Sequence, residues 1–175
     1  IIKPENHKNK IRIAFVWSFT LNGFEETIQV QCNDEKIHCT TYNSPYNQFN
    51  QEILNEDSNL YKFKPDIIFL LIDSRSILEN SFYFSNINSE NEKKKYTDEK
   101  FNEINNLIKT FTKKSHSKII IANFVIPTYT PLGIYESKIE YGIKEIIFEL
   151  NKKLKELSRN IDSLYIYDFN SFVFA

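Results

Sequence analysis

The chain has 175 residues, of which 41% are hydrophobic and 15% aromatic, so it is long enough for one packed domain and too apolar for a disordered protein. Its 22 basic and 23 acidic residues give a formal charge of -1, which provides no overall positive field to hold nucleic acid. No apolar run approaches the roughly 20 residues that span a bilayer, and residues 1–10 are polar rather than signal-like. We expect a cytoplasmic protein that binds neither nucleic acid nor membranes.

Five short apolar runs alternate with segments of helical pattern, which is typical of a parallel sheet buried on both faces. The predicted strands are Ile11–Trp17, Ile37–Tyr42, Ile67–Asp73, Ile119–Val125 and Leu164–Phe169. Right-handed crossovers between them favour a three-layer α/β/α sandwich whose five-stranded parallel sheet has the doubly wound order 2-1-3-4-5. We expect residues 1–10 to be a leading tail and residues 11–175 to be a single α/β domain, cut from a longer protein.

Apolar residues at helical spacing predict four helices between these strands. The helices cover Gly23–Gln31, Gln48–Glu56, a segment from Thr97 to Phe111, and a segment from Ser137 to about Leu157. Thr97 is the expected N-cap of the third helix, and Ser137-Lys138-Ile139-Glu140 fits a capping box for the fourth.

The connection Glu79–Tyr96 is longer than the usual loop between a strand and a helix. Its Asn, Ser and Lys content predicts the most mobile segment of the chain, which is either a lid or a solvated insertion without a functional role. We expect the Lys93–Lys95 run to lie in solvent.

Ligands of doubly wound sheets bind beyond the carboxyl ends of the strands, so the polar residues there form the candidate site. The candidates for substrate or partner binding are Thr20, Asn43, Ser44, Asp73, Ser74, Arg75 and Asn123. Structural roles are open for the same residues: Thr20 and its neighbour Ser18 can cap the first helix, Asp73 can cap a helix or pair with Arg75, and Asn123 can hold a turn.

Several kinds of cofactor site are excluded by the residues at these strand ends. The segment Val16–Gly23 has one Gly, at its end, so it is no glycine-rich phosphate loop. Asp73 stands where a receiver domain is phosphorylated, but such a domain needs an acidic pair for magnesium after the first strand, where this chain has Trp17-Ser18. Cys32 and Cys39 lack a second pair for zinc. We predict no metal and no cofactor in this chain.

Two family resemblances rest on short motifs. Trp17-Ser18-Phe19-Thr20 resembles the Gly-Asp-Ser-x-Thr block of SGNH, or GDSL-type, esterases, with Ser18 at the position of the nucleophile. Over roughly residues 11–170 the chain also resembles the N-terminal domain of FkbH-like proteins of the HAD superfamily, subfamily IIIC. The stretches that carry this second resemblance are Ile13–Leu21, Tyr42–Gln48, Leu60–Ile68, Ile121–Phe124, Leu150–Leu154 and Leu164–Asp168.

The second resemblance implies a division of labour between two domains. It implies an SGNH-like, flavodoxin-like fold for this chain and a C-terminal HAD domain that loads a glyceryl unit onto an acyl carrier protein, using an Asp-x-Asp motif and magnesium. This sequence contains no Asp-x-Asp. Magnesium is therefore expected only in that HAD domain, and the transfer chemistry is expected of no residue here.

A serine hydrolase of the SGNH type would need a His after the fifth strand to act as the base. Asp168 has no His three residues later, and His38 and His116 precede strands, at the opposite edge from Ser18. The third SGNH block aligns with Leu71–Ser74, which puts a carboxylate where a donor should meet the oxyanion.

Two functions therefore stay open. The first is a non-catalytic or degenerate domain that docks an acyl carrier protein, its phosphopantetheine arm or the HAD domain during glyceryl or acyl transfer. The alternative is a GDSL-type serine acyl hydrolase or acyltransferase with Ser18 as the nucleophile and its base outside this sequence. We expect the chain on its own to be inactive.

Overall fold

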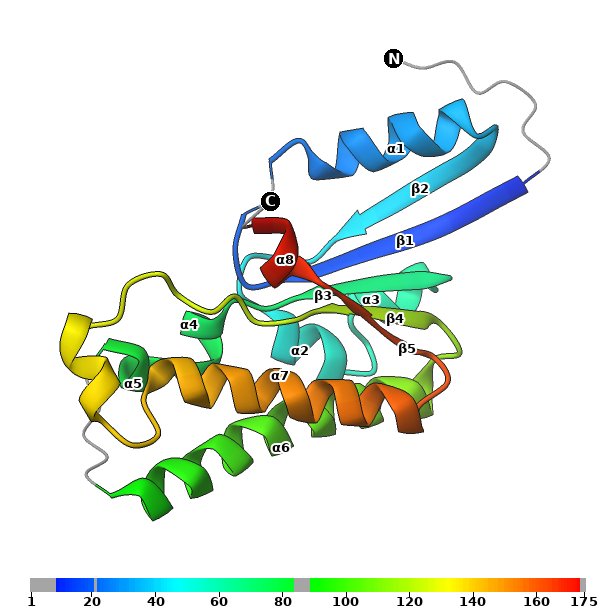
Figure 1. The fold of residues 1–175 in the computed structure, drawn as a ribbon. Helices are drawn as coiled ribbons and strands as arrows, with labels where there is room; N and C mark the ends of the chain where they lie inside the picture. Colours follow the sequence, from blue (N-terminus) through cyan, green and yellow to red (C-terminus); the bar gives the residue numbers. More distant parts are fainter. Residues whose placement is uncertain (1–8, 21, 84–88, 174–175) are drawn as a thin grey trace.

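A computed structural model of the chain describes residues 9–20, 22–83 and 89–173. Its core is a five-stranded sheet in which every pair of neighbouring strands is parallel, in the order β2-β1-β3-β4-β5 (Figure 1). The strands are β1 (Asn9–Trp17), β2 (Ile37–Asn43), β3 (Ile67–Leu71), β4 (Lys118–Ala122) and β5 (Leu164–Tyr167). The predicted α/β fold class and strand order are confirmed.

Helices fill the connections between the strands. They are α1 (Phe24–Asp34), α2 (Phe49–Leu54), α3 (Asn59–Phe63), α4 (Ser74–Leu78), α5 (Asn80–Tyr83), α6 (Glu90–Lys114), the 3-10 helix η1 (Gly133–Lys138), α7 (Ile143–Asn160) and α8 (Phe169–Val173). Over the ranges that the structure describes, none of them is both long and apolar enough to cross a membrane.

The helices divide unequally between the two faces of the sheet. Across the sheet, the connection from β1 to β2 runs toward one edge strand, and the later connections run toward the other edge strand, β5. Right-handed crossovers therefore place α1 on one face and α2, α6 and α7 on the other (Figure 1). On the face with three helices, apolar side chains of the strands pack against apolar side chains of the helices and form one buried core. Its members include Ile68, Leu70, Ile119, Ile121 and Leu164 from the strands and Ile104, Ile108, Phe111, Ile147, Leu150 and Leu154 from α6 and α7.

The face that carries α1 is covered only in part. Phe24 of α1 packs edge-to-face on Phe15 of β1, with ring centroids 5.4 Å apart. Farther along the sheet, Tyr165 and Tyr167 of β5 point to this same face and are 51% and 40% exposed. The sandwich therefore has three layers over β1 and β2 but leaves an open strip over β5.

Two predicted helix starts are wrong, and for the same reason. Thr97 lies inside α6, fully buried, with its hydroxyl donating to the Lys93 carbonyl at 2.8 Å. The helix begins earlier, at a capping box formed by Ser89 and Glu92. Ser137 lies in η1 and does not cap α7, whose N-cap is Gly142. In both cases the helix starts at another residue that is followed three positions later by a Glu, Ser89 with Glu92 in α6 and Gly142 with Glu145 in α7, so the local signal was present at a different position.

The predicted insertion Glu79–Tyr96 is mostly helical rather than irregular. It holds α5 and the first two turns of α6, while residues 84–88 lie outside the described ranges. Lys93 is buried and donates to the Glu140 carbonyl at 3.1 Å, and the Tyr96 hydroxyl donates to the Leu78 carbonyl at 2.7 Å. The expectation that the whole Lys93–Lys95 run is solvated is therefore wrong for Lys93.

Adjacent residues of β5 point to opposite faces of the sheet, which gives a matched test of the open strip. We expect Leu164→Ala to lower the free energy of unfolding by about 2–5 kcal/mol, because Leu164 is 3% exposed in the covered core. Tyr165→Ala, on the open strip, should lower it by about 1 kcal/mol or less. Urea unfolding followed by circular dichroism measures both losses. Equal losses would show that the strip is covered in solution.

Candidate functional site

Ser18 and Asp73 meet where β1 and β3 end. The Ser18 amide donates to the Leu71 carbonyl at 3.0 Å, which extends the pairing of the two strands by one residue. The Ser18 hydroxyl oxygen then accepts the Asp73 amide at 2.8 Å. Ser18 is only 3% exposed. Ser18 and Asp73 therefore lie side by side, and the contact that joins them is a hydrogen bond to the Asp73 backbone.

The Asp73 carboxylate is occupied by its own neighbours. It caps α4 by accepting the Arg75 amide at 2.8 Å, and it also accepts the Arg75 Nε at 2.8 Å. Ser74, the first residue of α4, is buried. Both structural roles considered for Asp73, the cap and the ion pair, are therefore present together. The Arg75 side chain is 59% exposed.

Asn123 joins the ends of β4 and β5. Its side-chain amide donates to Asp168 at 2.7 Å, and its side-chain oxygen accepts the Asn170 amide at 2.8 Å. Asp168 also accepts the hydroxyl and the amide of Ser171, at 2.7 and 3.1 Å. Led by the Ser171 hydroxyl and then the Asn123 amide, these bonds lower the pKa of Asp168 below its ordinary value.

The end of β2 is held by a second polar cluster. The side chains of Asn43 and Thr41 both donate to the Glu25 carboxylate on α1, and Gln29 donates to Thr41 at 2.8 Å. This cluster ties α1 to β2. Asn43 Oδ1 is buried without a hydrogen-bond partner among the residues that the structure describes.

Ser44 fastens the end of β2 to the end of β1. Its hydroxyl accepts the Trp17 amide at 3.3 Å, and its carbonyl accepts the Trp17 indole N–H at 3.2 Å. Ser44 is buried. Its polar groups serve the junction of two strands rather than an open surface.

Thr20 and Ser18 do not cap the first helix, contrary to one of the structural roles considered for them. The N-cap of α1 is Gly23, whose φ of 80° lies in the left-handed region that glycine tolerates best. Thr20 is exposed and makes none of the hydrogen bonds found among the described residues. It therefore stays a surface residue beside the rim, our name for the carboxyl edge of the sheet where Ser18, Ser44, Asp73 and Asn123 follow the strands.

No imidazole is placed beside Ser18 by the part of the chain that is described. His38 pairs with Lys10 near the start of β2, and His116 lies just before β4, so both belong to the opposite edge of the sheet. His7 lies outside the described residues. Over those same residues, no group of three or more His, Cys, Asp or Glu side chains could hold a metal ion.

Sequence reasoning missed two features of this edge. One is a ring cluster in which Phe169 stacks on Phe19 at 6.3 Å and on Phe172 at 6.1 Å. The other is a pair of hydrogen bonds between Asn151 of α7 and the backbone of Phe124, both 2.7 Å. Phe19 and Phe169 are 150 residues apart in the chain, and Phe124 and Asn151 are 27 apart, so no local pattern indicates these two contacts. A run of aromatic residues after β5 was the only signal.

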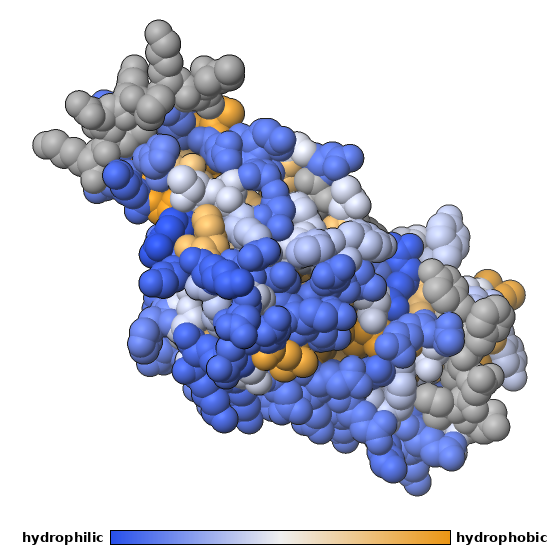
Figure 2. All heavy atoms as spheres, turned by 180° about the vertical axis from the view of Figure 1, so that it is seen from behind, coloured by the Kyte–Doolittle hydropathy of each residue, from blue (hydrophilic) through white to orange (hydrophobic). Residues whose placement is uncertain are grey.

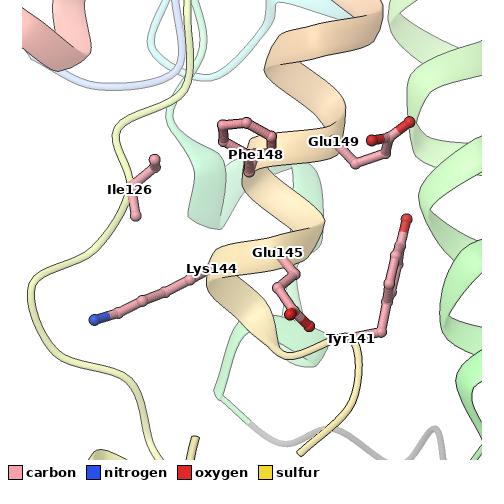
Figure 3. A pocket seen from close by; sticks show the side chains of 6 residues that line it. All are labelled: Ile126, Tyr141, Lys144, Glu145, Phe148 and Glu149. Atoms are coloured by element: carbon pink, nitrogen blue, oxygen red, sulfur yellow. The ribbon is translucent and has the colours of Figure 1, made fainter. Parts of the chain in front are cut away.

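A hollow of about 410 Å³ lies between the segment that follows β4 and the first half of α7. Figure 3 shows Ile126 on that segment and Phe148 on α7, with Lys144 extending from the helix toward the segment. The lining residues are Ile126, Tyr141, Lys144, Glu145, Phe148 and Glu149. The first residues of α7 lie near the carboxyl edge of the sheet. The hollow beside them is therefore near the same edge as the rim residues.

Large apolar side chains stand exposed on the segment that leads into this helix. Tyr129 is 87% exposed, Ile134 97% and Tyr135 61%. We call residues 129–135 the apolar segment. Exposed aromatic side chains also gather at β5 and α8, where Tyr165, Tyr167 and Phe172 are 51%, 40% and 64% exposed. On the back of the molecule, Figure 2 shows apolar residues at several places on a largely hydrophilic face. Exposed apolar groups gathered on one segment are typical of an interaction site.

Comparison with solved structures shows the fold. The N-terminal part of the protein BF1531 from Bacteroides fragilis, described as containing a phosphatase domain complexed with Mg, matches with a TM-score of 0.76 and 16% identity. The match covers 94% of this chain and 42% of that one, so the chain spans less than half of its neighbour. The acetyl xylan esterase AlAXEase matches with a TM-score of 0.51 and 12% identity over 92% of this chain and 78% of its own.

Comparison with curated proteins gives no match. The family model described as FkbH, N-terminal domain, matches residues 10–174, which is nearly the whole chain. Its extent agrees with the described sheet, from the first strand to α8. The chain therefore belongs to the FkbH N-terminal domain family.

Proposed function

We propose that this chain is a non-catalytic, degenerate SGNH-like domain that assists glyceryl or acyl transfer to an acyl carrier protein by docking the carrier or a partner domain. In this proposal the transfer chemistry, with its magnesium, belongs to a separate HAD domain. The Bacteroides fragilis protein with the similar fold is described as containing a phosphatase domain complexed with Mg, which supports such a division. Because the described residues offer no cluster of metal ligands, no step of the proposal passes through a metal held here.

The state of Ser18 carries this proposal. A serine nucleophile needs a base to take its proton and an open path to the carbonyl carbon. Ser18 is 3% exposed, and the nearest described groups are the backbone of Leu71 and Asp73. An unassisted hydroxyl in that position is a weak nucleophile with little room for a substrate.

The surroundings of Ser18 also disfavour an oxyanion site. An oxyanion hole aims N–H groups at the place where negative charge develops. Here the Asp73 amide donates to Ser18 itself, and the adjacent carboxylate of Asp73 would repel a developing anion. The same groups are well suited to holding the ends of β1 and β3 together.

The rim and the apolar segment form the proposed docking surface. Thr20 and Arg75 present exposed polar groups at the carboxyl edge, and Asp73 and Asn123 lie partly exposed beside them. Tyr129, Ile134 and Tyr135 could add the apolar contact that a small carrier protein needs for stable binding. The buried Asn43, Ser44 and Ser74 would then support this surface from beneath rather than touch the partner.

A serine acyl hydrolase of the GDSL type is the second candidate. The likeness to an acetyl xylan esterase fold and the place of Ser18 at the carboxyl end of β1 favour it. In that case the base would come from outside these 175 residues.

Labelling with a fluorophosphonate separates the two candidates. We expect neither labelling nor hydrolysis of p-nitrophenyl acetate above the level of Ser18→Ala, because Ser18 has no base and is buried. Thr20→Ala, which removes an exposed hydroxyl nearby, is the control for non-specific reaction. The same measurements should be made on a chain that includes any further domain. Labelling lost only in Ser18→Ala would overturn the non-catalytic proposal.

Binding to a holo acyl carrier protein tests the docking surface directly. We expect Ile134→Asp to weaken the binding by at least about tenfold, because it places a charge in an apolar contact. Val30→Asp on α1 is the matched control, since Val30 is also an exposed apolar residue, at 43%. Isothermal titration calorimetry with holo and apo carrier proteins then shows whether the phosphopantetheine arm contributes. Equal losses in both variants would contradict this surface.

Acid sensitivity tests the bonds that hold the rim. Ser171→Ala should raise the pKa of Asp168 toward the ordinary value of about 3.9, because the Ser171 hydroxyl is the largest cause of its lowering. Ser158→Ala, which removes a hydroxyl from α7, is the control. The side-chain carboxyl signal of Asp168 followed by NMR gives the pKa in each variant.

The sign of the stability change follows from the lowered pKa. A carboxyl whose pKa is lower in the folded state stabilises the fold above its unfolded pKa, and this stabilisation is lost as the pH falls through the folded value. The wild type should therefore lose more stability than Ser171→Ala between pH 5 and pH 2. An unchanged pKa in Ser171→Ala would contradict the assigned bond.

A further inference from the structure

A second hollow, of about 620 Å³, lies at the opposite edge of the sheet, where the strands begin. Its walls come from three segments far apart in the chain: the start of β1, the connection from α3 to β3, and the turn from α6 to β4. The lining residues are Arg12, Tyr61, Lys64, Pro65, Asp66, Lys114, Ser115, His116, Ser117 and Lys118. Its volume falls within the range of small-molecule sites, about 300–1,000 Å³. None of the rim residues discussed above belongs to it.

Hydrogen bonds between these segments hold the hollow in shape. Asp66 accepts the Arg12 amide at 2.8 Å and the Arg12 guanidinium at 3.3 Å, and its carbonyl accepts the Lys118 amide at 3.0 Å. The Ser117 hydroxyl donates to the Pro65 carbonyl at 2.5 Å. A cavity whose walls are joined in this way needs little reorganisation to accept a ligand.

The charge of the lining differs in sign from that of the whole chain. Four cationic side chains and one carboxylate line the hollow, whereas the chain carries a formal charge of -1. Arg12 is paired with Asp66, and Lys114 with Glu56 at 3.2 Å. Among the ion pairs of the described residues, Lys64 and Lys118 have no carboxylate partner.

These two lysines are not explained by the common role of cations in neutralising the negative end of a helix dipole. Cations are common at helix C-termini, where carbonyl groups are unpaired, and Lys114 fills that role by donating to the Leu54 carbonyl at 3.1 Å. Lys118 begins a strand, and Lys64 is the C-cap of a helix of only five residues, whose dipole is small. Lys118 has an aromatic neighbour instead, the ring of Tyr165, at 5.7 Å.

We propose that this hollow binds a small phosphate-bearing anion, with Lys64 and Lys118 as its charge contacts. A phosphate monoester carries close to two negative charges at pH 7, which matches the two lysines that lack carboxylate partners. Charge-assisted hydrogen bonds to phosphate oxygens are stronger than neutral ones. The concave shape favours a compact ligand over the flat contact of a protein surface. This site is independent of the docking proposed for the carboxyl edge.

Titration of the chain with inorganic pyrophosphate tests this site, followed by two-dimensional NMR of the backbone amides. We expect saturable shifts at residues 64 and 114–118. The double variant Lys64→Gln/Lys118→Gln should weaken the binding by at least about tenfold. Both side chains are exposed, so the fold should be kept, which circular dichroism checks. The control Lys62→Gln/Lys113→Gln removes two charges from the adjoining helices α3 and α6, outside the lining, and should leave the affinity within twofold.

Further arms identify the source of the phosphate group. Glycerol 3-phosphate represents a soluble monoester, and vesicles of phosphatidylcholine with phosphatidylinositol phosphate represent a lipid headgroup. Binding of the monoester at the same residues supports the proposal and assigns a soluble ligand. Binding to the vesicles that is lost in the lysine variant also supports it and assigns a headgroup. No saturable shift up to 10 mM of any probe (about 3 kcal/mol of affinity), or equal weakening in the control, would overturn it.

Discussion

The right-handed crossover of parallel strands is the constraint on which the rest of this structure depends. It sends the first connection to one face of the sheet and the later ones to the other, because the strand order reverses direction at β1. Because every strand pair is parallel, the carboxyl ends of β1, β3 and β4 lie at one rim, and the reversal places the switch point between β1 and β3 there. The reversal also leaves α1 with no neighbour over β5, so Tyr165 and Tyr167 stay exposed on a strand whose other side packs on the core through the buried Leu164 and the partly buried Ile166. The position of the candidate site and the open strip over β5 both follow from this strand order and its right-handed crossovers.

The polar residues at the rim serve mainly to close strand ends. Where parallel strands stop, their last amides and carbonyls lose their ladder partners and need others. Ser44 supplies one for Trp17, Ser18 supplies one for Asp73, and Asn123 bridges the end of β4 to the start of α8. Polar residues at these positions are therefore required by the fold itself. This explains how a rim can keep the residue types of a catalytic site while most of its side chains are engaged internally.

The sequence was a good guide to the sheet and a poor one to contacts between distant segments. Continuous apolar runs predict buried parallel strands because such strands face helices or other apolar groups along their length, and all five were found in the expected order. Thr97 and Ser137 failed as helix caps because α6 starts earlier, at the capping box of Ser89 and Glu92, and α7 starts later, at Gly142. Thr97 is instead buried inside α6. The bond between Asn123 and Asp168 joins residues 45 positions apart, and the burial of Lys93 depends on a carbonyl 47 residues away. No local pattern encodes either contact.

Burial, rather than the hydrogen bond it makes, sets the chemistry of Ser18. Its oxygen accepts the Asp73 amide, which leaves the hydroxyl proton available to any base that could approach. At 3% exposure, however, an approaching base and an ester carbonyl would both have to displace the chain around it. The displaced segments would include the start of α4, whose cap and ion pair centre on Asp73. A base brought by another domain would need a rearrangement around Ser18 before it could act, whereas a docking role needs none.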